Sequence, residues 1–214
     1  AFAEDRLDES GETSSVRDRH LAWVLTRAEA MTPGFDGPEP ADAAAMARRL
    51  LNDARAAIHH AEQSSQAAAI WRLVDHLAPL CFYDGVIDDA LDWAARAAAV
   101  DDGGHPEATA PGLVAAALLA TSRGDHDEIV HALERASEAA ELAGDRRSQG
   151  RAIVLGAAHD TWHRPADALP TLARGIDICA SSGDPTWAAW GSCGAALAYT
   201  FLGRPADALS HLDE

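Results

Sequence analysis

The chain has 214 residues and a formal net charge of −17 at pH 7, because 34 acidic side chains outnumber 17 basic ones. This balance argues against a nucleic-acid-binding surface, which would need clustered Lys and Arg to bind phosphates. The three cysteines form no Cys-x-x-Cys pair, and neither an 18-residue apolar run nor a basic leader occurs, so we expect a soluble cytoplasmic protein without a membrane partner.

The first 40 residues are expected to precede a repeat domain. A short helical end over 2–9 and a second helix before residue 32 form a helical junction over 1–31. Residues 32–40 carry three prolines and two glycines, so we expect a linker without a regular element. A long helix with Met46 in its buried stripe follows and opens the repeat domain, which covers 41–214.

A repeated phrase sets the organisation of this domain. Arg164–Leu169 recurs letter for letter as Arg204–Leu209, and similar turn positions fall at 85, 124, 163 and 203, spaced by 39, 39 and 40 residues. Self-similarity at a fixed period predicts stacked supersecondary units, and the many alanines favour helices. The expected units are about 41–64 (partial), 65–103, 104–143, 144–182 and 183–214 (truncated).

Glycine and proline mark the ends and starts of the expected helices. Glycine at 124, 144, 183 and 203 suits the conformation that ends a helix, and proline at 165, 185 and 205 suits the first helical turn. Pro79 and Pro170 fall inside expected helices, and the sequence leaves open whether each kinks or ends its helix. We therefore predict an all-α fold, a right-handed superhelix of antiparallel helix pairs of the tetratricopeptide-like α-solenoid type, with a concave face.

Several stretches, taken in order, resemble one family. They are Ala3–Leu7, Val16–Trp23, Pro33–Pro38, Asn52–Ile58 and Pro79–Gly85. Together they are similar to the region that follows the winged-helix domain in large actinobacterial STAND-type regulators of the LuxR and SARP kind. The hairpins themselves resemble tetratricopeptide repeats, with alanine at 90, 168 and 208, while Ile129 takes that place in the second unit.

This resemblance implies an ATPase domain of the NB-ARC kind upstream and a DNA-binding domain at one end of the parent protein. The 214 residues contain no Gly-x-x-x-x-Gly-Lys-Ser/Thr phosphate loop. We therefore expect no cofactor in this chain, ATP only in an absent upstream domain, and DNA contact only through absent domains.

Two sets of side chains are candidates for a site. His159 and His163 lie four residues apart, as the zinc ligands of metalloproteases do, but Asp160 replaces the general-base Glu and no third ligand is evident. We therefore predict a structural role for the pair and no metal. The candidate residues of a partner-binding groove are Trp71, His76, Trp162, Trp187 and Trp190, because aromatic side chains anchor partners; the alternative is that the tryptophans fill space between repeats.

The sequence thus predicts a non-enzymatic domain whose concave face binds a protein or small-molecule effector and so biases the ATPase of a larger transcriptional regulator. One alternative is a stand-alone scaffold that binds a peptide or a helical protein. Another is an enzyme that uses His159 and His163, which would require a stoichiometric metal.

Overall fold

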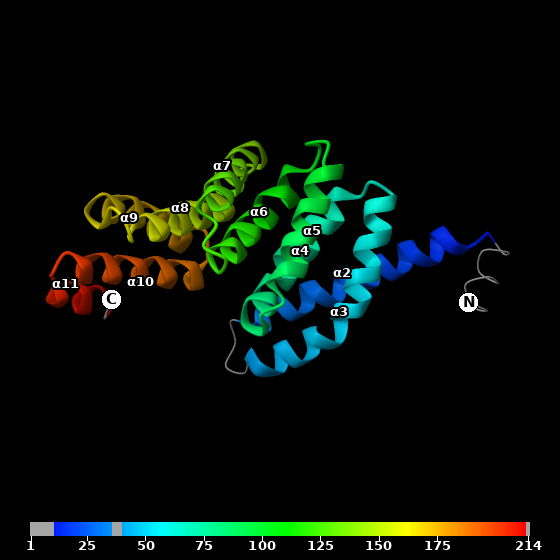
Figure 1. The fold of residues 1–214 in the computed structure, drawn as a ribbon, viewed down its shortest axis with the longest axis horizontal. Helices are drawn as coiled ribbons and strands as arrows, with labels where there is room; N and C mark the ends of the chain where they lie inside the picture. The colour runs from blue at the N-terminus through cyan, green and yellow to red at the C-terminus, as the bar shows by residue number, and fades with distance from the viewer. Residues whose placement is uncertain (1–10, 36–39, 213–214) are drawn as a thin grey trace. The chain divides into compact units, whose positions relative to one another are not determined.

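The structure is a computed structural model that describes residues 11–35 and 40–212. These residues form ten α-helices and no strand, so the predicted all-α class is confirmed (Figure 1). The helical end expected over 2–9 lies outside the described residues. The helices are α2 (Thr13–Phe35), α3 (Pro40–Gln63), α4 (Ala67–Asp84), α5 (Ile87–Val100), α6 (Pro106–Thr121), α7 (His126–Ala143), α8 (Arg146–Asp160), α9 (Pro165–Ser181), α10 (Pro185–Phe201) and α11 (Pro205–Leu212).

The chain divides into two compact units, residues 1–108 and residues 109–214. In the first unit, α2 packs against α3 and α4, and α5 packs against α4 and α3. The core of this unit is built around Trp71 and Trp93, which are 1% and 2% exposed. Among the described residues, no helix has the length and apolar character needed to cross a membrane.

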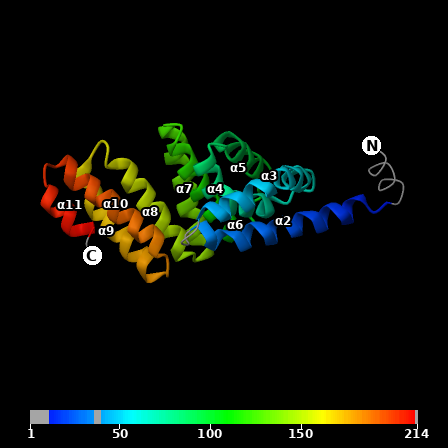
Figure 2. The ribbon, with the colours of Figure 1, turned by 90° about the horizontal axis from the view of Figure 1, so that it is seen from below.

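In the second unit, each helix from α7 onward packs against the next one, and α8 also packs against α10. Figures 1 and 2 both show α9 and α10 side by side. Because short turns join helices that are packed together, the part of this unit from α7 onward folds into successive antiparallel hairpins. This is the helical-repeat arrangement that the 39- and 40-residue spacing predicts.

The helix boundaries follow the glycine and proline pattern. Pro165, Pro185 and Pro205 begin α9, α10 and α11. Gly144 ends α7 with a φ of 66°, and its backbone N–H donates to carbonyls of the last helical turn. Pro79 and Pro170 lie inside α4 and α9, so neither proline ends its helix.

The linker predicted over 32–40 is wrong at its start, because α2 continues through Pro33 to Phe35. Met31 and Phe35 are buried, and this packing outweighs the helix-breaking tendency of proline so close to the helix end. Gly34 lets the backbone of α2 approach α3, since a Cβ atom there would lie 3.0 Å from the Cβ of Ala43. Residues 36–39 lie outside the described ranges.

Glycines allow the helices of the second unit to pack closely. A Cβ atom on Gly175 of α9 would lie 2.8 Å from Cγ2 of Val154 on α8. A Cβ atom on Gly191 of α10 would lie 2.5 Å from Cγ1 of Ile176 on α9. Both distances are shorter than van der Waals contact, so these helices can approach one another only where a side chain is missing.

Candidate functional site

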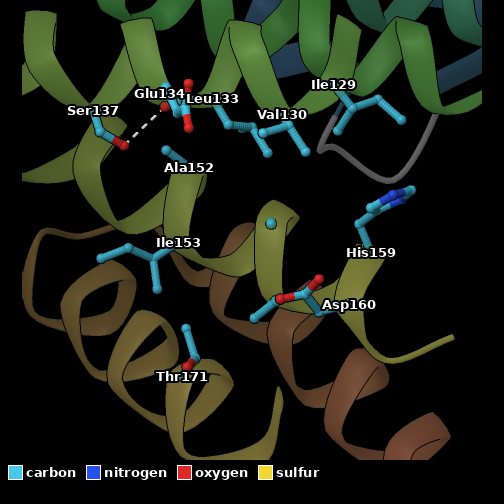
Figure 3. A pocket seen from close by; sticks show the side chains of 12 residues that line it. Ile129, Val130, Leu133, Glu134, Ser137, Ala152, Ile153, His159, Asp160 and Thr171 are labelled. Atoms are coloured by element: carbon cyan, nitrogen blue, oxygen red, sulfur yellow. Dashed lines mark hydrogen bonds between the residues drawn. The ribbon is translucent and has the colours of Figure 1, made fainter. Parts of the chain in front are cut away.

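A groove with a volume of about 280 Å³ opens in the second unit where α7 packs against α8 (Figure 3). We call it the α7/α8 groove. Twelve residues line it: Ile129, Val130, Leu133, Glu134 and Ser137 of α7, Ala152, Ile153, Gly156, Ala157, His159 and Asp160 of α8, and Thr171 of α9.

The α7/α8 groove has an apolar floor and an acidic rim. Ile129 and Leu133 are buried beneath it, whereas the side chain of Val130 is 38% exposed. Glu134 and Asp160 add carboxylates to the lining, one from each helix (Figure 3). An apolar surface bordered by negative charge is suited to an apolar group that carries positive charge beside it.

Gly156 explains why this surface is hollow. It lies in the lining of the groove on α8, and the nearest atom to a Cβ built on it would be Cδ1 of Leu133, at 3.5 Å. This is an ordinary van der Waals distance, so a methyl group would fit there without displacing α7. The absent side chain therefore leaves space, whereas the absent side chains of Gly175 and Gly191 are required for close packing.

Three histidines meet near one end of the groove. Nδ1 of His126, at the start of α7, lies 2.6 Å from Nε2 of His159, and the two rings stack with their centroids 4.9 Å apart. His163 stands edge-on to both, with centroid distances of 6.5 Å to His126 and 6.3 Å to His159. The pair expected from the sequence thus gains His126 as a neighbour. In the part of the chain that the structure describes, however, no group of three His, Cys, Asp or Glu side chains is arranged to hold a metal ion.

The environment of His159 favours its neutral form. Burial lowers the pKa of His159, the charges of His126 and His163 lower it further, and Asp160 acts in the opposite direction. The short contact with His126 requires one nitrogen to donate a hydrogen bond and the other to accept it, so at least one of these two rings is neutral.

Two of the predicted groove residues belong to the packing of the first unit. Trp71 is 1% exposed and its Nε1 donates to Oδ2 of Asp101 at 2.9 Å, so the prediction that it lines a partner-binding groove is wrong. His76 has a side chain that is 16% exposed. Its Nδ1 lies 3.0 Å from Oγ1 of Thr32, which ties α4 to α2.

The other three predicted residues lie at the surface of the second unit. Trp162 is 65% exposed and packs against Phe201, with ring centroids 5.3 Å apart. Trp190 is 43% exposed and its ring centroid lies 5.6 Å from that of Trp187. The guanidinium of Arg151 lies 5.5 Å from the centroid of the Trp187 ring. None of these side chains lines the α7/α8 groove.

A buried ion pair anchors the surface beside Trp187. The side chain of Asp184 is 2% exposed and accepts hydrogen bonds from Nε of Arg151 at 2.6 Å and from Nε of Arg147 at 3.0 Å. Burial alone raises the pKa of Asp184, but the two arginines outweigh burial and the pKa lies below its ordinary value. Burial also raises the pKa of the nearby Cys179 to about 11, so this thiol is protonated at neutral pH and is not a nucleophile.

Sequence reasoning missed the α7/α8 groove because its lining contains no tryptophan and draws on α7, the second helix of its pair. One signal was present. Ile129 stands where the other units have Ala90, Ala168 and Ala208, and it forms part of the floor of the groove. The one unit without alanine at this position is thus the unit that contributes α7 to the groove.

These helices define a helical-repeat protein that carries an apolar groove with an acidic rim. No protein-family model matches the chain, and no curated protein does. Among solved structures, a de novo designed helical repeat protein is similar to it over 92% of this chain and 99% of that one, with 18% sequence identity and a TM-score of 0.30.

Proposed function

We propose that this chain is a non-catalytic protein-interaction domain whose α7/α8 groove binds a segment of a partner protein. The observation that carries the proposal is the groove itself, in which the half-exposed Val130 lies over a buried apolar floor and beside two carboxylates. Helical repeats serve as scaffolds on which such surfaces are displayed.

The size of the groove indicates the kind of partner. Pockets for drug-sized molecules usually hold about 300–1,000 Å³. At about 280 Å³ the α7/α8 groove suits one or two bulky apolar side chains of a peptide or helix. Glu134 favours Arg or Lys next to those side chains, because complementary charges direct association and exclude acidic partners. Asp160 contributes less, since its Oδ2 already lies 3.2 Å from Nη2 of Arg164.

The test uses a phage-displayed library of random ten-residue peptides selected on the full chain. We expect one class of recovered peptides to combine a bulky apolar residue with Arg or Lys. Val130→Asp places a charge at the mouth of the groove and should weaken binding of this class at least tenfold. Leu142→Asp is the matched control, because Leu142 is 80% exposed on α7 and does not line the groove. Peptides that bind both variants equally would rule out this site.

We further propose that the domain is the sensing arm of a larger ATP-dependent transcriptional regulator, as the ordered resemblance to STAND-type proteins suggests. Binding of an effector or partner would then bias the ATPase only if the two conformations of the parent bind it with different affinity. A phosphate loop encoded upstream of Ala1 supports this context, and its absence within several hundred codons favours the stand-alone scaffold. In such a parent, Val130→Asp should abolish the effector response while the domain stays folded.

A further inference from the structure

A second groove, with a volume of about 150 Å³, lies in the first unit where α2 packs against α3. We call it the α2/α3 groove. Trp23, Arg27 and Met31 line it from α2, and Met46, Arg49, Leu50 and Asp53 line it from α3. It is independent of the α7/α8 groove, because it lies in the other unit and shares no residue with it.

Large apolar side chains are exposed at this groove. Met46 is 54% exposed, so the prediction that it belongs to the buried stripe of its helix is wrong. Trp23 is 45% exposed, whereas Met31 and Leu50 beneath are nearly buried, at 6% and 5%. The groove therefore has an apolar floor between a rigid indole and a flexible thioether. Tryptophan is frequent at binding hot spots, and methionine adapts its shape to varied partners.

The charge around the α2/α3 groove differs from that of the whole chain. Although the chain carries −17, the two helices together hold six arginines against five carboxylates. The arginines are Arg17, Arg19, Arg27, Arg48, Arg49 and Arg55, and the carboxylates are Asp18, Glu29, Asp42, Asp53 and Glu62. This hairpin therefore carries a slight excess of positive charge although the whole chain is acidic.

Most of these carboxylates are already engaged. Asp18 lies 2.7 Å from Nε2 of His60, Asp53 lies 3.2 Å from Nε2 of His20, and Arg72 reaches Glu29 at 3.3 Å. The remaining engaged carboxylate is that of Glu62, which accepts a hydrogen bond from Nε of Arg96 at 3.0 Å.

Arg27 and Arg49 differ from these residues, because among the described residues neither pairs with a carboxylate. The guanidinium of Arg27 lies 5.8 Å from the ring centroid of Trp23, and Arg49 lines the opposite side of the groove from α3. Asp53 also lines the groove, and its carboxylate lies 3.2 Å from Nε2 of His20. Two guanidinium groups thus stand beside one carboxylate at the groove, and both are available to an anionic partner.

We propose that the α2/α3 groove binds a peptide segment that presents one bulky apolar side chain flanked by acidic residues. A volume of about 150 Å³ accommodates one such side chain and is too small for a drug-sized molecule. The apolar side chain supplies most of the affinity, and Asp or Glu on either side of it pairs with Arg27 and Arg49. The α2/α3 groove and the α7/α8 groove thus select partners of opposite charge.

The same phage-displayed library of ten-residue peptides tests this site on the full chain. We expect a second class of recovered peptides, with one bulky apolar residue and at least two Asp or Glu within four positions of it. Fluorescence anisotropy should show that Arg27→Glu combined with Arg49→Glu weakens these peptides at least tenfold, and that 0.5 M NaCl weakens them as well. The matched control is Arg174→Glu, an exposed arginine of α9 in the other unit, which should change binding less than twofold.

A charge-swapped peptide, with each acidic residue replaced by Lys, shows whether the double variant has kept its fold. It should bind the double variant more tightly than it binds the unchanged chain. The proposal is overturned if no acidic class is recovered, if the double variant binds the acidic peptides as well as the unchanged chain does, or if it binds neither peptide. It is also overturned if Val130→Asp abolishes their binding, since they would then occupy the α7/α8 groove. Loss of the basic class alone would reject the first site and leave this one standing.

Discussion

Replacing Asp184 with Asn should be one of the most damaging single changes in the second unit. The side chain of Asp184 is 2% exposed and lies at the start of α10, while both of its partners, Arg147 and Arg151, come from α8. Asp184→Asn keeps the shape of the side chain but removes its charge. The variant therefore isolates the electrostatic link between the two helices.

The magnitude follows from the three hydrogen bonds that the two arginines donate to the carboxylate. Hydrogen bonds that involve a charged group contribute about 1.5–3 kcal/mol each, and removing one partner of a buried ion pair costs about 3–5 kcal/mol. Arg147 is 52% exposed, so water compensates it in part, whereas Arg151 is 18% exposed and lies 2.6 Å from the carboxylate. Because Asn retains one acceptor for Arg151, we expect the free energy of unfolding to fall by about 2–4 kcal/mol.

The assay is urea unfolding at pH 7, followed by tryptophan fluorescence. Asp207→Asn is the control, because it removes a surface Arg–Asp pair in which Asp207 is 50% exposed and accepts from Nε of Arg204 at 2.7 Å. That change should cost less than about 0.5 kcal/mol. A fall of less than about 1 kcal/mol for Asp184→Asn would show that the buried pair does not hold α8 to α10.

The pH dependence gives a second check on Asp184. Its pKa is below the ordinary value in the folded state, so its contribution is present above the unfolded value of 3.8 and is lost as the pH falls through the folded pKa. The difference between the unchanged chain and Asp184→Asn should therefore stay constant from pH 7 to 5 and narrow below pH 3.8. A difference that stays constant at low pH would exclude an ionised Asp184 as its source.

Three further changes test other parts of the structure. Because the pKa of His159 is lowered in the folded state, the stability of the chain should decline as the pH falls below 6.5. Thermal melts between pH 7.5 and 5.5 should show a smaller decline for His159→Gln. An equal decline in the melting temperature of both proteins would contradict this. Gly191→Ala should destabilise the chain by about 1–3 kcal/mol, because its Cβ would lie 2.5 Å from Ile176. Gly156→Ala should be neutral or stabilising by up to about 1 kcal/mol. Calorimetry that finds Gly156→Ala less stable than Gly191→Ala would refute the packing argument. Trp71→Phe should cost about 1–3 kcal/mol in urea unfolding because it removes the hydrogen bond to Asp101, and an unchanged midpoint would contradict that.

The helices and their ends were predictable because local chemistry determines them. Proline at the first helical turn and glycine after the last one act on the backbone of their own segment, whatever packs against it. Pro165 and Pro205 therefore start helices as expected. Pro33 shows the limit of this reasoning, since burial of Met31 and Phe35 keeps α2 helical across it.

Burial was less predictable, and the repeated phrase shows why. The two copies start equivalent helices, and Ala168 and Ala208 are both buried, at 2% and 7%. Leu169 packs against a buried cluster that includes Ala195 of α10, whereas Leu209, at the same place in the phrase, is 67% exposed. Identical residues thus form equivalent helices in the two copies, but they do not contact equivalent neighbours. Exposure depends on which element covers a face, and that is a property of the assembled unit.

The same distinction accounts for the two grooves. A repeat explains why helices stack, because each hairpin buries the apolar face of the one before it. A perfect repeat would give every unit the same surface, so a specific site has to come from positions that depart from the pattern. Ile129 is such a position, and Gly156 opposite α7 leaves space beside it. The α2/α3 hairpin departs in charge, with more arginines than carboxylates in a chain of −17. The sites that we propose therefore lie at residues that differ from the repeat pattern. Variants at these residues should change binding, whereas variants at residues that follow the pattern should change stability.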